Sequence, residues 1–512
     1  MVRRAGSLWL VASVVVVSAG AAQRKPLPKV LDQAFDAAID SVLKAWKVPG
    51  LGIGVVKGNR IVLLKGYGFK NLEEKIPVTP TTKFAIGSVT KSFAVTALAA
   101  QAAAGLFDWD APVRRYLPDF QMFDAAVSER MTPRDLVVHR SGLPRHDVMW
   151  GGGTFTRDDL YQRLRYLEPT RDFRSVWQYQ NLMYMTAGYL SGKLDQLPWE
   201  TVVKNRVFEP LGMATADASV NDLQRSADYA FGYARLPSDS VVRISYRNLD
   251  AIGPAGSINA NITEMLKYVT MHLDQGRFEG REIIPAAQAR QMQAPQMVIP
   301  VPSTPGPGGL DLGHESYGMG FFINTYRGHK LVHHGGNIDG FSAEVNFLPN
   351  DSIGVVVLTN LNGTPTRDFI PYMIYDRLLG LDPINWSGRF KAQADRAKAR
   401  ADSVRAKDVA SRVSGTSPSH PLADYAGTYT HPGYGDMTVT LVDGKLKLAY
   451  SSFNLGMEHW HYDVFEAEPR SAANPLRWRV QFHMDATGAI TSLSLPIEPA
   501  LKPAFFARRS ER

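Results

Sequence analysis

The sequence predicts an α+β protein, in which strands at both ends of a first domain share a sheet, helices lie between them, and a small β-domain follows. Apolar, β-rich runs occur near the start, at 51–64, and again at 318–360, with helical patterns between them. We therefore expect both ends of this region to share one sheet. Short β-like runs dominate the last part of the chain. At 512 residues the chain is longer than one core supports, since cores stop growing at roughly 250–300 residues.

The first residues are typical of a secretion signal. Arg3 and Arg4 carry positive charge, Leu8–Val17 is apolar, and Ala19–Ala21 offers small residues for cleavage. The apolar run is shorter than the about 20 residues that a membrane-spanning helix needs. We predict a signal peptide over 1–21, a periplasmic or secreted protein by an export route left open, and no transmembrane segment after signal removal. The sequence contains no cysteine, which excludes thiol chemistry and disulfides.

Two helices and a hairpin are predicted in the N-terminal part. Apolar residues recur at helical spacing over Val30–Trp46, and Val48–Gly50 ends that helix. The β-rich runs of Leu51–Leu64 then form a hairpin around a turn at 57–60. A second helix over Ser88–Ala104 is rich in Ala, Val and Leu on all sides and stops at Gly105, which indicates a buried helix.

Later segments define the remaining organisation. The residues at 318–324, 330–334, 343–348 and 353–360 are typical of consecutive strands. Runs at 437–442 and 445–450 flank Asp443-Gly444, a strong hairpin signal. We expect a first domain over 28–385, a charged helix or linker over 386–420, and a small β-domain over 421–512.

The positive charge of the chain is concentrated in one segment. The formal net charge is +8, but residues 389–412 alone hold eight basic residues against three acidic ones. The rest of the chain after signal removal is close to neutral. A basic nucleic-acid surface is therefore not supported, and the charged segment is more simply a solvated helix or linker.

A serine and a lysine stand at the start of the second helix. Ser88 and Lys91 lie three residues apart and share one helix face. A serine hydroxyl needs a base to become a good nucleophile, and a lysine serves if burial or nearby cations favour its neutral amine. The helix N-terminus adds backbone N–H groups for a developing oxyanion. The spacing alone is weak evidence, because Ser41 and Lys44 share it in the first helix.

Two further motifs strengthen the prediction that Ser88 is a nucleophile and Lys91 its base. Tyr179 and Asn181 are two apart in a stretch expected to be extended, so both side chains point to one side. His334-Gly335-Gly336 ends a predicted strand, where a glycine lets a substrate backbone approach closely.

These three motifs, in this order, resemble those of the serine β-lactamase and penicillin-binding protein superfamily, especially its class C-like and esterase or D-aminopeptidase branch. The resemblance covers about residues 30–380 and implies a β-lactamase/transpeptidase-like fold, which is an antiparallel sheet with a helical subdomain. The C-terminal domain resembles the small β-barrel-like domains found on such hydrolases. It implies Ser88 as the nucleophile, Lys91 and Tyr179 as partners in proton transfer, and Asn181 as a donor to the substrate amide. His334 and Gly336 would line the substrate site. The N–H of Asn337 would join that of Ser88 in an oxyanion hole.

The predicted function is hydrolysis of an ester, amide or peptide through an acyl-enzyme, with a small molecule or peptide as substrate. No metal and no organic cofactor is expected. His334 replaces the lysine of the Lys-Thr-Gly form and removes a fixed positive charge, which favours an esterase or D-peptidase over a β-lactamase. The alternative is a penicillin-recognising sensor that is acylated but does not turn over. The oligomeric state and the role of the C-terminal domain stay open.

Several other residues are expected to carry no chemistry. The stretches 131–136, 139–144 and 253–256 also resemble the family, and His139 is interpreted as structural because the lysine already fills the role of the base. His333 is an alternative to His334, although Gly340-Phe341 follows at the distance expected from His334. The run His459–Asp463 mimics the H-x-H-x-D ligands of metallo-hydrolases, but Val464 stands where a further histidine would follow, so a polar strand face is favoured.

Overall fold

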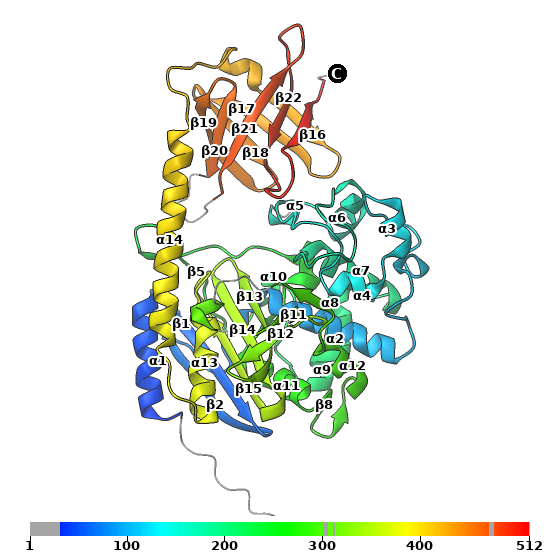
Figure 1. Ribbon diagram of the computed structural model, residues 1–512, viewed down its shortest axis with the longest axis vertical. Helices are drawn as coiled ribbons and strands as arrows, with labels where there is room; N and C mark the ends of the chain where they lie inside the picture. Colours follow the sequence, from blue (N-terminus) through cyan, green and yellow to red (C-terminus); the bar gives the residue numbers. More distant parts are fainter. Residues whose placement is uncertain (1–30, 153, 301–305, 311–312, 470–475, 511–512) are drawn as a thin grey trace, which may run out of the picture.

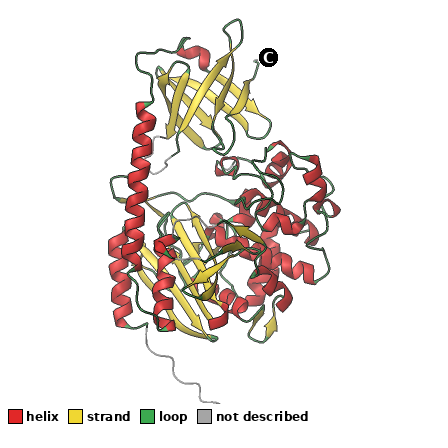
Figure 2. Ribbon diagram, in the orientation of Figure 1, coloured by secondary structure: helices red, strands yellow, loops and turns green. Residues whose placement is uncertain are grey.

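The computed structural model describes residues 31–152, 154–300, 306–310, 313–469 and 476–510. The predicted signal peptide at 1–21 lies outside these residues. The predicted fold class is confirmed: a sheet with helices on both faces and a helical subdomain forms the larger part, and a barrel of strands follows (Figures 1 and 2). No helix within the described ranges is long and apolar enough to cross a membrane.

Nine strands form the main sheet, and every neighbouring pair is antiparallel. The predicted hairpin is its N-terminal part, and it pairs with the last strand of the later group, so the two ends of this region do share one sheet. In spatial order the strands are β10 (Met297–Ile299), β11 (Glu315–Tyr317), β12 (Phe322–Tyr326), β13 (His329–Ile338), β14 (Phe341–Leu348), β15 (Ile353–Thr359), β1 (Gly50–Lys57), β2 (Arg60–Asn71) and β3 (Ile76–Pro77).

Helices cover both faces of this sheet. On one face α1 (Gln33–Trp46) and α13 (Thr366–Leu379) pack against alternate residues of β1 and β15, such as Ile53 and Val355. On the other face α11 (Ile262–Leu273) packs so closely that a Cβ at Gly54 would lie 2.9 Å from Leu266. Gly54 therefore lets the helix approach the strand closely.

The helical subdomain lies beside the β10 to β14 side of the sheet (Figure 1). Its long buried helices are the predicted one after Ser88 and a second that follows Tyr179. Its helices are α2 (Thr90–Ala103), α3 (Ala125–Arg130), α4 (Pro133–Val137), α5 (Val148–Gly151), α6 (Arg157–Arg163), α7 (Asn181–Asp195), α8 (Trp199–Val203), α9 (Glu209–Leu211), α10 (Val220–Leu223) and α12 (Ala286–Met292), with 3-10 turns η1 (Gly87–Val89) and η5 (Asp250–Ala255).

Short strand pairs complete this region. One pair lies directly before Ser88 and ties the chain to the segment after η5. The pairs are β4 (Phe84–Ala85) with β7 (Asn259–Ala260), β5 (Tyr233–Arg235) with β6 (Val241–Arg243), and β8 (Arg277–Phe278) with β9 (Arg281–Glu282).

The charged segment forms one long helix, α14 (Trp386–Ala410), which runs from the sheet to the barrel (Figure 1). Only its start is anchored in the main core, by Trp386 and Phe390. Most of the remaining side chains are exposed, and Lys398 pairs with Asp402 at i,i+4 spacing.

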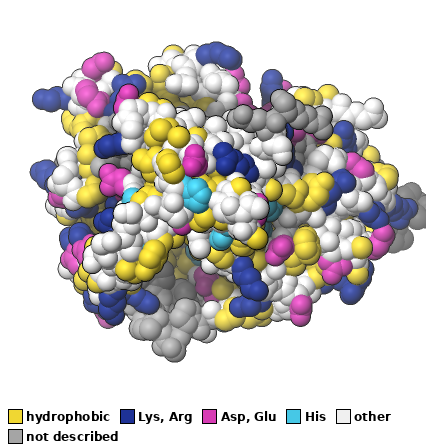
Figure 3. All heavy atoms as spheres, turned by 90° about the horizontal axis from the view of Figure 1, so that it is seen from above, with side chains coloured by type: hydrophobic (Ala, Val, Ile, Leu, Met, Phe, Trp, Pro, Cys, Tyr) yellow, Lys and Arg dark blue, Asp and Glu magenta, His cyan; other side chains and the backbone are white. Residues whose placement is uncertain are grey.

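The C-terminal domain is a closed antiparallel barrel. Its core consists of buried, inward-facing residues that alternate with exposed or half-buried ones, as in β18. Figure 3, which looks down on this end of the molecule, shows basic and acidic side chains interspersed on that face. The strands are β16 (Gly427–His431), β17 (Gly435–Val442), β18 (Lys445–Tyr450), β19 (Phe453–His461), β20 (Val464–Pro469), β21 (Trp478–Met484), β22 (Ile490–Leu495) and β23 (Ala504–Arg508).

One strand prediction was wrong in its position. The residues at 318–321 form a tight turn, in which the Gly318 N–H donates to the Phe321 carbonyl, and the strand begins only at Phe322. Gly320 has a φ of +85° and packs against the backbone of Ser92. The close contact with α2 requires a glycine in a turn at this position. The apolar pattern of the sequence does not reveal this contact, so the strand was predicted to begin too early.

Candidate active site

Ser88 lies at the first turn before α2, where the chain crosses the end of β13. Gly87 precedes it with a φ of +52°, and a Cβ there would lie 2.8 Å from the backbone nitrogen of Asn337. Only a glycine can adopt this positive φ and also leave room for the backbone of Asn337. Ser88 itself is partly exposed, whereas Gly87 and Val89 are buried. The local structure thus presents one hydroxyl at the surface of a packed helix start.

Lys91 is fully buried one turn further along the helix. Its Nζ lies 3.0 Å from Ser88 Oγ and donates to the carbonyl oxygen of Ala255 at 2.7 Å. Burial lowers the pKa of Lys91 well below its usual range, and the charge of Arg145 lowers it further. A neutral amine keeps N–H groups for Ala255 and a lone pair that can accept the proton of Ser88.

Tyr179 covers this pair from the other side. Lys91 Nζ lies 4.8 Å from the centre of its ring, and the guanidinium carbon of Arg145 lies 4.9 Å from it. Burial raises the pKa of the Tyr179 hydroxyl, while a hydrogen bond with Ser88 and the charge of Arg145 offset part of the rise. The protonated phenol can therefore donate and relay a proton next to Ser88.

Asn181 begins α7, and its side chain is hydrogen-bonded to another residue of the protein. Its side-chain amide donates to Asp147 Oδ1 at 2.9 Å, and the indole N–H of Trp150 donates to the same oxygen at 2.9 Å. Between the two site residues, the buried Gln180 donates to the Pro144 carbonyl and accepts from the Leu182 N–H. Gln180 thus fixes the strip that carries Tyr179 and Asn181.

His334 lies beside Tyr179, and the centres of the two rings are 6.3 Å apart. It is buried; its Nδ1 lies 2.7 Å from the Gly335 carbonyl oxygen and its Nε2 lies 3.1 Å from the Tyr317 hydroxyl. Burial and the nearby Lys91 lower the pKa of His334 well below its usual range, so the ring is neutral near pH 7. His333, the alternative, contacts Glu344 instead, at 2.9 Å.

Gly336 and Asn337 meet the backbone around Ser88. A Cβ at Gly336 would overlap the Ile86 carbonyl oxygen and lie 3.0 Å from the Ser88 nitrogen. The Asn337 side chain is turned toward Asn362 and Ser342, so only its backbone is left near Gly87. The structure therefore brings Ser88, Lys91, Tyr179, His334 and the 336–337 backbone together, with Asn181 linked through Asp147.

Sequence reasoning missed several neighbours of this site. The stretch 253–256 was expected to carry no chemistry, yet the Ala255 carbonyl holds the Lys91 amine. Arg145, which faces Tyr179, and Asp147, which holds Asn181, stand directly after the stretch 139–144. The only available signal for them was this adjacency.

His139 is buried beneath the ring of Tyr179, with the two ring centres 4.3 Å apart. Its Nδ1 accepts the N–H of Gln180 at 3.0 Å. It does not contact Ser88 through any hydrogen bond between described residues. Burial and Lys91 lower its pKa well below the usual range, so His139 is a neutral ring that supports the tyrosine.

The metal-like run in the barrel does not gather into one cluster. His459 Nε2 contacts the Tyr462 carbonyl, His461 Nδ1 accepts the N–H of Val413, and Asp463 accepts from Ser419 and Tyr425. A bulge between His459 and His461 breaks the expected common face. Over the described ranges, no three His, Asp or Glu residues are grouped as metal ligands.

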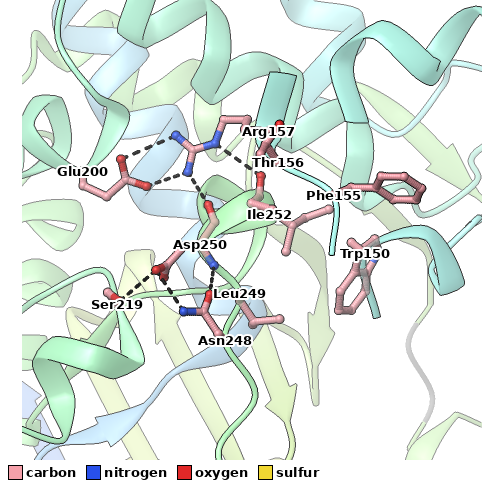
Figure 4. Close-up of a pocket in the computed structure, with 11 residues that line it drawn as sticks. Trp150, Phe155, Thr156, Arg157, Glu200, Ser219, Asn248, Leu249, Asp250 and Ile252 are labelled. Atoms are coloured by element: carbon pink, nitrogen blue, oxygen red, sulfur yellow. Dashed lines mark hydrogen bonds and ion pairs between the residues drawn. The ribbon is translucent and has the colours of Figure 1, made fainter. Parts of the chain in front are cut away.

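A cavity of about 520 Å³ lies along η5, and none of the candidate site residues lines it (Figure 4). Trp150, which is bonded to Asp147, lines it together with Phe155 and Leu249. Across the cavity, Arg157 donates to Glu200 and to the backbone of Asp250. The cavity therefore combines an apolar wall with a hydrogen-bonded polar cluster, and it borders η5, which ends at the carbonyl that holds Lys91.

The sheet, the helical subdomain and the serine and lysine at the start of a buried helix define the β-lactamase/transpeptidase class. The chain belongs to the β-lactamase family, whose profile matches residues 35–376. Residues 411–509 match a second family, described as a domain of unknown function (DUF3471).

Similar proteins include an unguisins hydrolase of Aspergillus campestris, 27% identical over 82% of this chain and 80% of the relative. A second unguisins hydrolase, of Aspergillus violaceofuscus, is 26% identical over 92% of this chain and 89% of the relative. Protein flp of Staphylococcus aureus is 25% identical over 67% of this chain and 64% of the relative.

Two solved structures illustrate the fold. An octameric penicillin-binding protein homologue from Pyrococcus abyssi has a TM-score of 0.59 at 23% identity, over 92% of this chain and 99% of the other. A D-amino acid amidase from Ochrobactrum anthropi has a TM-score of 0.55 at 22% identity, over 68% of this chain and 98% of the other. At such low identity these similarities concern the fold alone.

Proposed function

We propose that this protein is a serine hydrolase that forms an acyl-enzyme at Ser88 and releases it with water. The observation that carries the proposal is the 3.0 Å approach of Nζ of the fully buried Lys91 to Ser88 Oγ. The neutral amine takes the proton of Ser88 as its oxygen attacks the carbonyl carbon. Tyr179 relays that proton to the leaving group. The second step repeats these roles with water in place of Ser88.

The proposed oxyanion hole consists of the backbone N–H groups of Ser88 and Asn337. The packing of Gly87 against the Asn337 nitrogen supports it, because it places the two backbone segments side by side. Such preorganised donors stabilise the tetrahedral intermediate, and the loss of one typically costs about 10²–10³-fold in kcat.

The proposed substrate is an ester, amide or peptide, with esterase or D-peptidase activity favoured over β-lactamase activity. His334 is neutral and buried, so this position offers no fixed charge to a substrate carboxylate. The cavity with Trp150, Phe155 and Leu249 is linked to the site only indirectly, by the hydrogen bond of Trp150 to Asp147, and we propose it as the place for a bulky apolar group of the substrate. The similarity to the two unguisins hydrolases also supports hydrolysis rather than binding alone.

A substrate panel tests this proposal. It contains nitrophenyl esters of increasing chain length, D-amino acid amides, peptides ending in two D-alanines, and β-lactams, each with wild type and Ser88→Ala. Product release and intact-protein mass are followed together. We expect turnover of an ester, amide or peptide, with a transient adduct on the peptide that contains Ser88. A lasting β-lactam adduct without any product would instead indicate a sensor. The absence of both product and adduct would refute an acyl-enzyme.

A further inference from the structure

Three consecutive residues connect the candidate site to the C-terminal barrel. Arg145 lies over the ring of Tyr179, and Asp147 accepts hydrogen bonds from Asn181 and Trp150. Both outer members of this 145–147 strip thus contact groups of the proposed hydrolase site. The middle member, His146, makes its contacts elsewhere.

His146 is held mainly by the barrel, while its Nε2 lies 3.3 Å from the carbonyl oxygen of Glu168 in the larger domain. Its Nδ1 lies 2.8 Å from the hydroxyl of Tyr434, and its backbone N–H donates to Glu498 Oε2 at 2.8 Å. The φ of His146 is +48°, which lies in the left-handed region. This conformation is energetically unfavourable for any residue that carries a side chain. His146, Tyr434 and Glu498 are all buried. An unfavourable backbone conformation next to the site is therefore fixed by two side chains from another domain.

The barrel is itself firmly attached, so it can act as a support. At the end of α14, Arg405 pairs with Glu466 and Asp408 pairs with Arg479. A second attachment lies near the strip, where the Ser452 N–H donates to the Gly152 carbonyl at 3.2 Å. Figure 1 shows the same arrangement, with α14 reaching the barrel on one side and α5 lying below the barrel on the other.

We propose that Tyr434 and Glu498 are positioning residues for the reaction, which fix His146 and thereby set Arg145 against Tyr179 and Asp147 against Asn181. The inference rests on the proposed function at Ser88, and it gives the barrel a role there without any contact to substrate. Positioning of this kind acts mainly on kcat, because small displacements of groups around the reacting atoms are costly.

The electrostatic setting of Lys91 provides a specific readout. The charged or titratable groups around its amine are Arg145, Asp147, Tyr179, Tyr184, His139 and His334. Arg145 lowers the pKa of Lys91 more than Asp147 raises it. If the strip is released, both charges move away, and the acid limb of kcat/KM shifts to higher pH. A barrel that contributes only to stability would not cause this shift.

The test compares Glu498→Ala with Glu498→Gln, and Tyr434→Phe with Tyr429→Phe. Glutamine keeps an oxygen that accepts the His146 N–H. Tyr429 is the matched control, because its hydroxyl donates within the barrel, to the Tyr425 carbonyl. We expect Glu498→Ala to lower kcat on the best ester by about 10-fold with a small change in KM, and to raise the pH of the acid limb. Tyr434→Phe should act in the same direction, whereas Glu498→Gln and Tyr429→Phe stay within about 2-fold of wild type.

Arg145→Ala, alone and combined with Glu498→Ala, gives a double-mutant cycle. If Glu498 acts through Arg145, the double variant shows no more pH shift than Arg145→Ala. Equal losses in Glu498→Ala and Glu498→Gln, or a loss of kcat without any pH shift, would overturn the inference.

Hydrogen exchange separates this inference from the proposed function. Amide exchange of a peptide over 145–152 should rise in Glu498→Ala and remain as in wild type in Glu498→Gln. This readout needs no activity. Unchanged exchange in Glu498→Ala contradicts the inference even if the enzyme turns over. A wild type that hydrolyses nothing and forms no adduct contradicts the proposed function, while raised exchange still supports the structural link.

Discussion

Lys91 Nζ and Ser88 Oγ lie 3.0 Å apart at the start of a helix that is buried on nearly every side. A second serine and lysine at the same spacing, Ser41 and Lys44, are exposed on α1. The chain thus contains an internal control, in which the same sequence pattern lies in two different environments. The lysine of the first pair is fully buried, and burial disfavours its charge.

Replacement of the two serines should separate these environments. Ser88→Ala removes the proposed nucleophile, and we expect it to lower ester turnover by about 10³-fold or more. Ser41→Ala removes only a hydroxyl that bonds the Ala37 carbonyl within the helix, and it should leave turnover nearly unchanged. Steady-state rates on the same nitrophenyl ester decide the matter. Comparable activity in both variants would mean that Ser88 is not the nucleophile.

The pH dependence of kcat/KM should report the base. Lys91 must be neutral to accept a proton, so activity is present above its pKa in the folded protein and is lost as the pH falls through that value. Because the pKa of Lys91 is lowered, this loss should lie well below the 10.5 of an ordinary lysine. Lys91→Arg should be inactive at every pH, since a guanidinium does not lose its proton in proteins. An acid limb near 10.5, or an active Lys91→Arg, would contradict the role of Lys91.

Gly336 should tolerate no side chain. A Cβ at this position overlaps the Ile86 carbonyl and crowds the Ser88 nitrogen. We expect Gly336→Ala to lower activity by at least about 10²-fold and the free energy of unfolding by about 1–3 kcal/mol. Gly456→Ala in the barrel is the control, because the nearest atom to its Cβ would be 4.0 Å away. Urea unfolding and ester turnover are measured on both. Equal stability and activity of the two variants would show that the backbone at 336 has room to move.

The sequence was sufficient to predict the class of fold and the helix start that carries Ser88, because both depend on local patterns. Apolar, β-rich runs predicted β1 and the strands around β14, and an apolar surround marked the helix after Ser88 as buried. The order of the three motifs then indicated which residues to examine at the site.

The neighbours of the site depend on contacts between distant segments, so no local pattern reveals them. The Ala255 carbonyl reaches Lys91 because η5 packs against α2, 164 residues further along the chain. The backbone of His146 is left-handed although it carries a side chain, and its partners Tyr434 and Glu498 belong to another domain. Tertiary contacts of this kind override local preference, and functional sites are where such exceptions gather.

Acid should destabilise the protein in part through His272, which lies on α11 among Tyr268, Phe321 and Phe347. Neither ring nitrogen has a hydrogen-bond partner among the described residues, and burial lowers the pKa of His272 to about 3. The unfolded chain binds this proton near pH 6.5, so below that pH the unfolded state holds more protons than the folded state. Stability therefore falls as the pH drops from 6.5 toward 3, and His272 alone accounts for about 3 kcal/mol at pH 4.

His272→Leu removes the titrating group and keeps an apolar side chain of similar size. We expect the decline in the free energy of unfolding between pH 7 and pH 4 to be smaller by about 3 kcal/mol than in wild type. Part of the decline remains, because burial also lowers the pKa values of His139, His146 and His334. Phe321→Leu, in the same aromatic group, is the control, since it weakens packing at every pH and leaves the acid dependence as in wild type. Urea unfolding at both pH values measures the difference, and parallel curves for His272→Leu and wild type would place the acid sensitivity elsewhere.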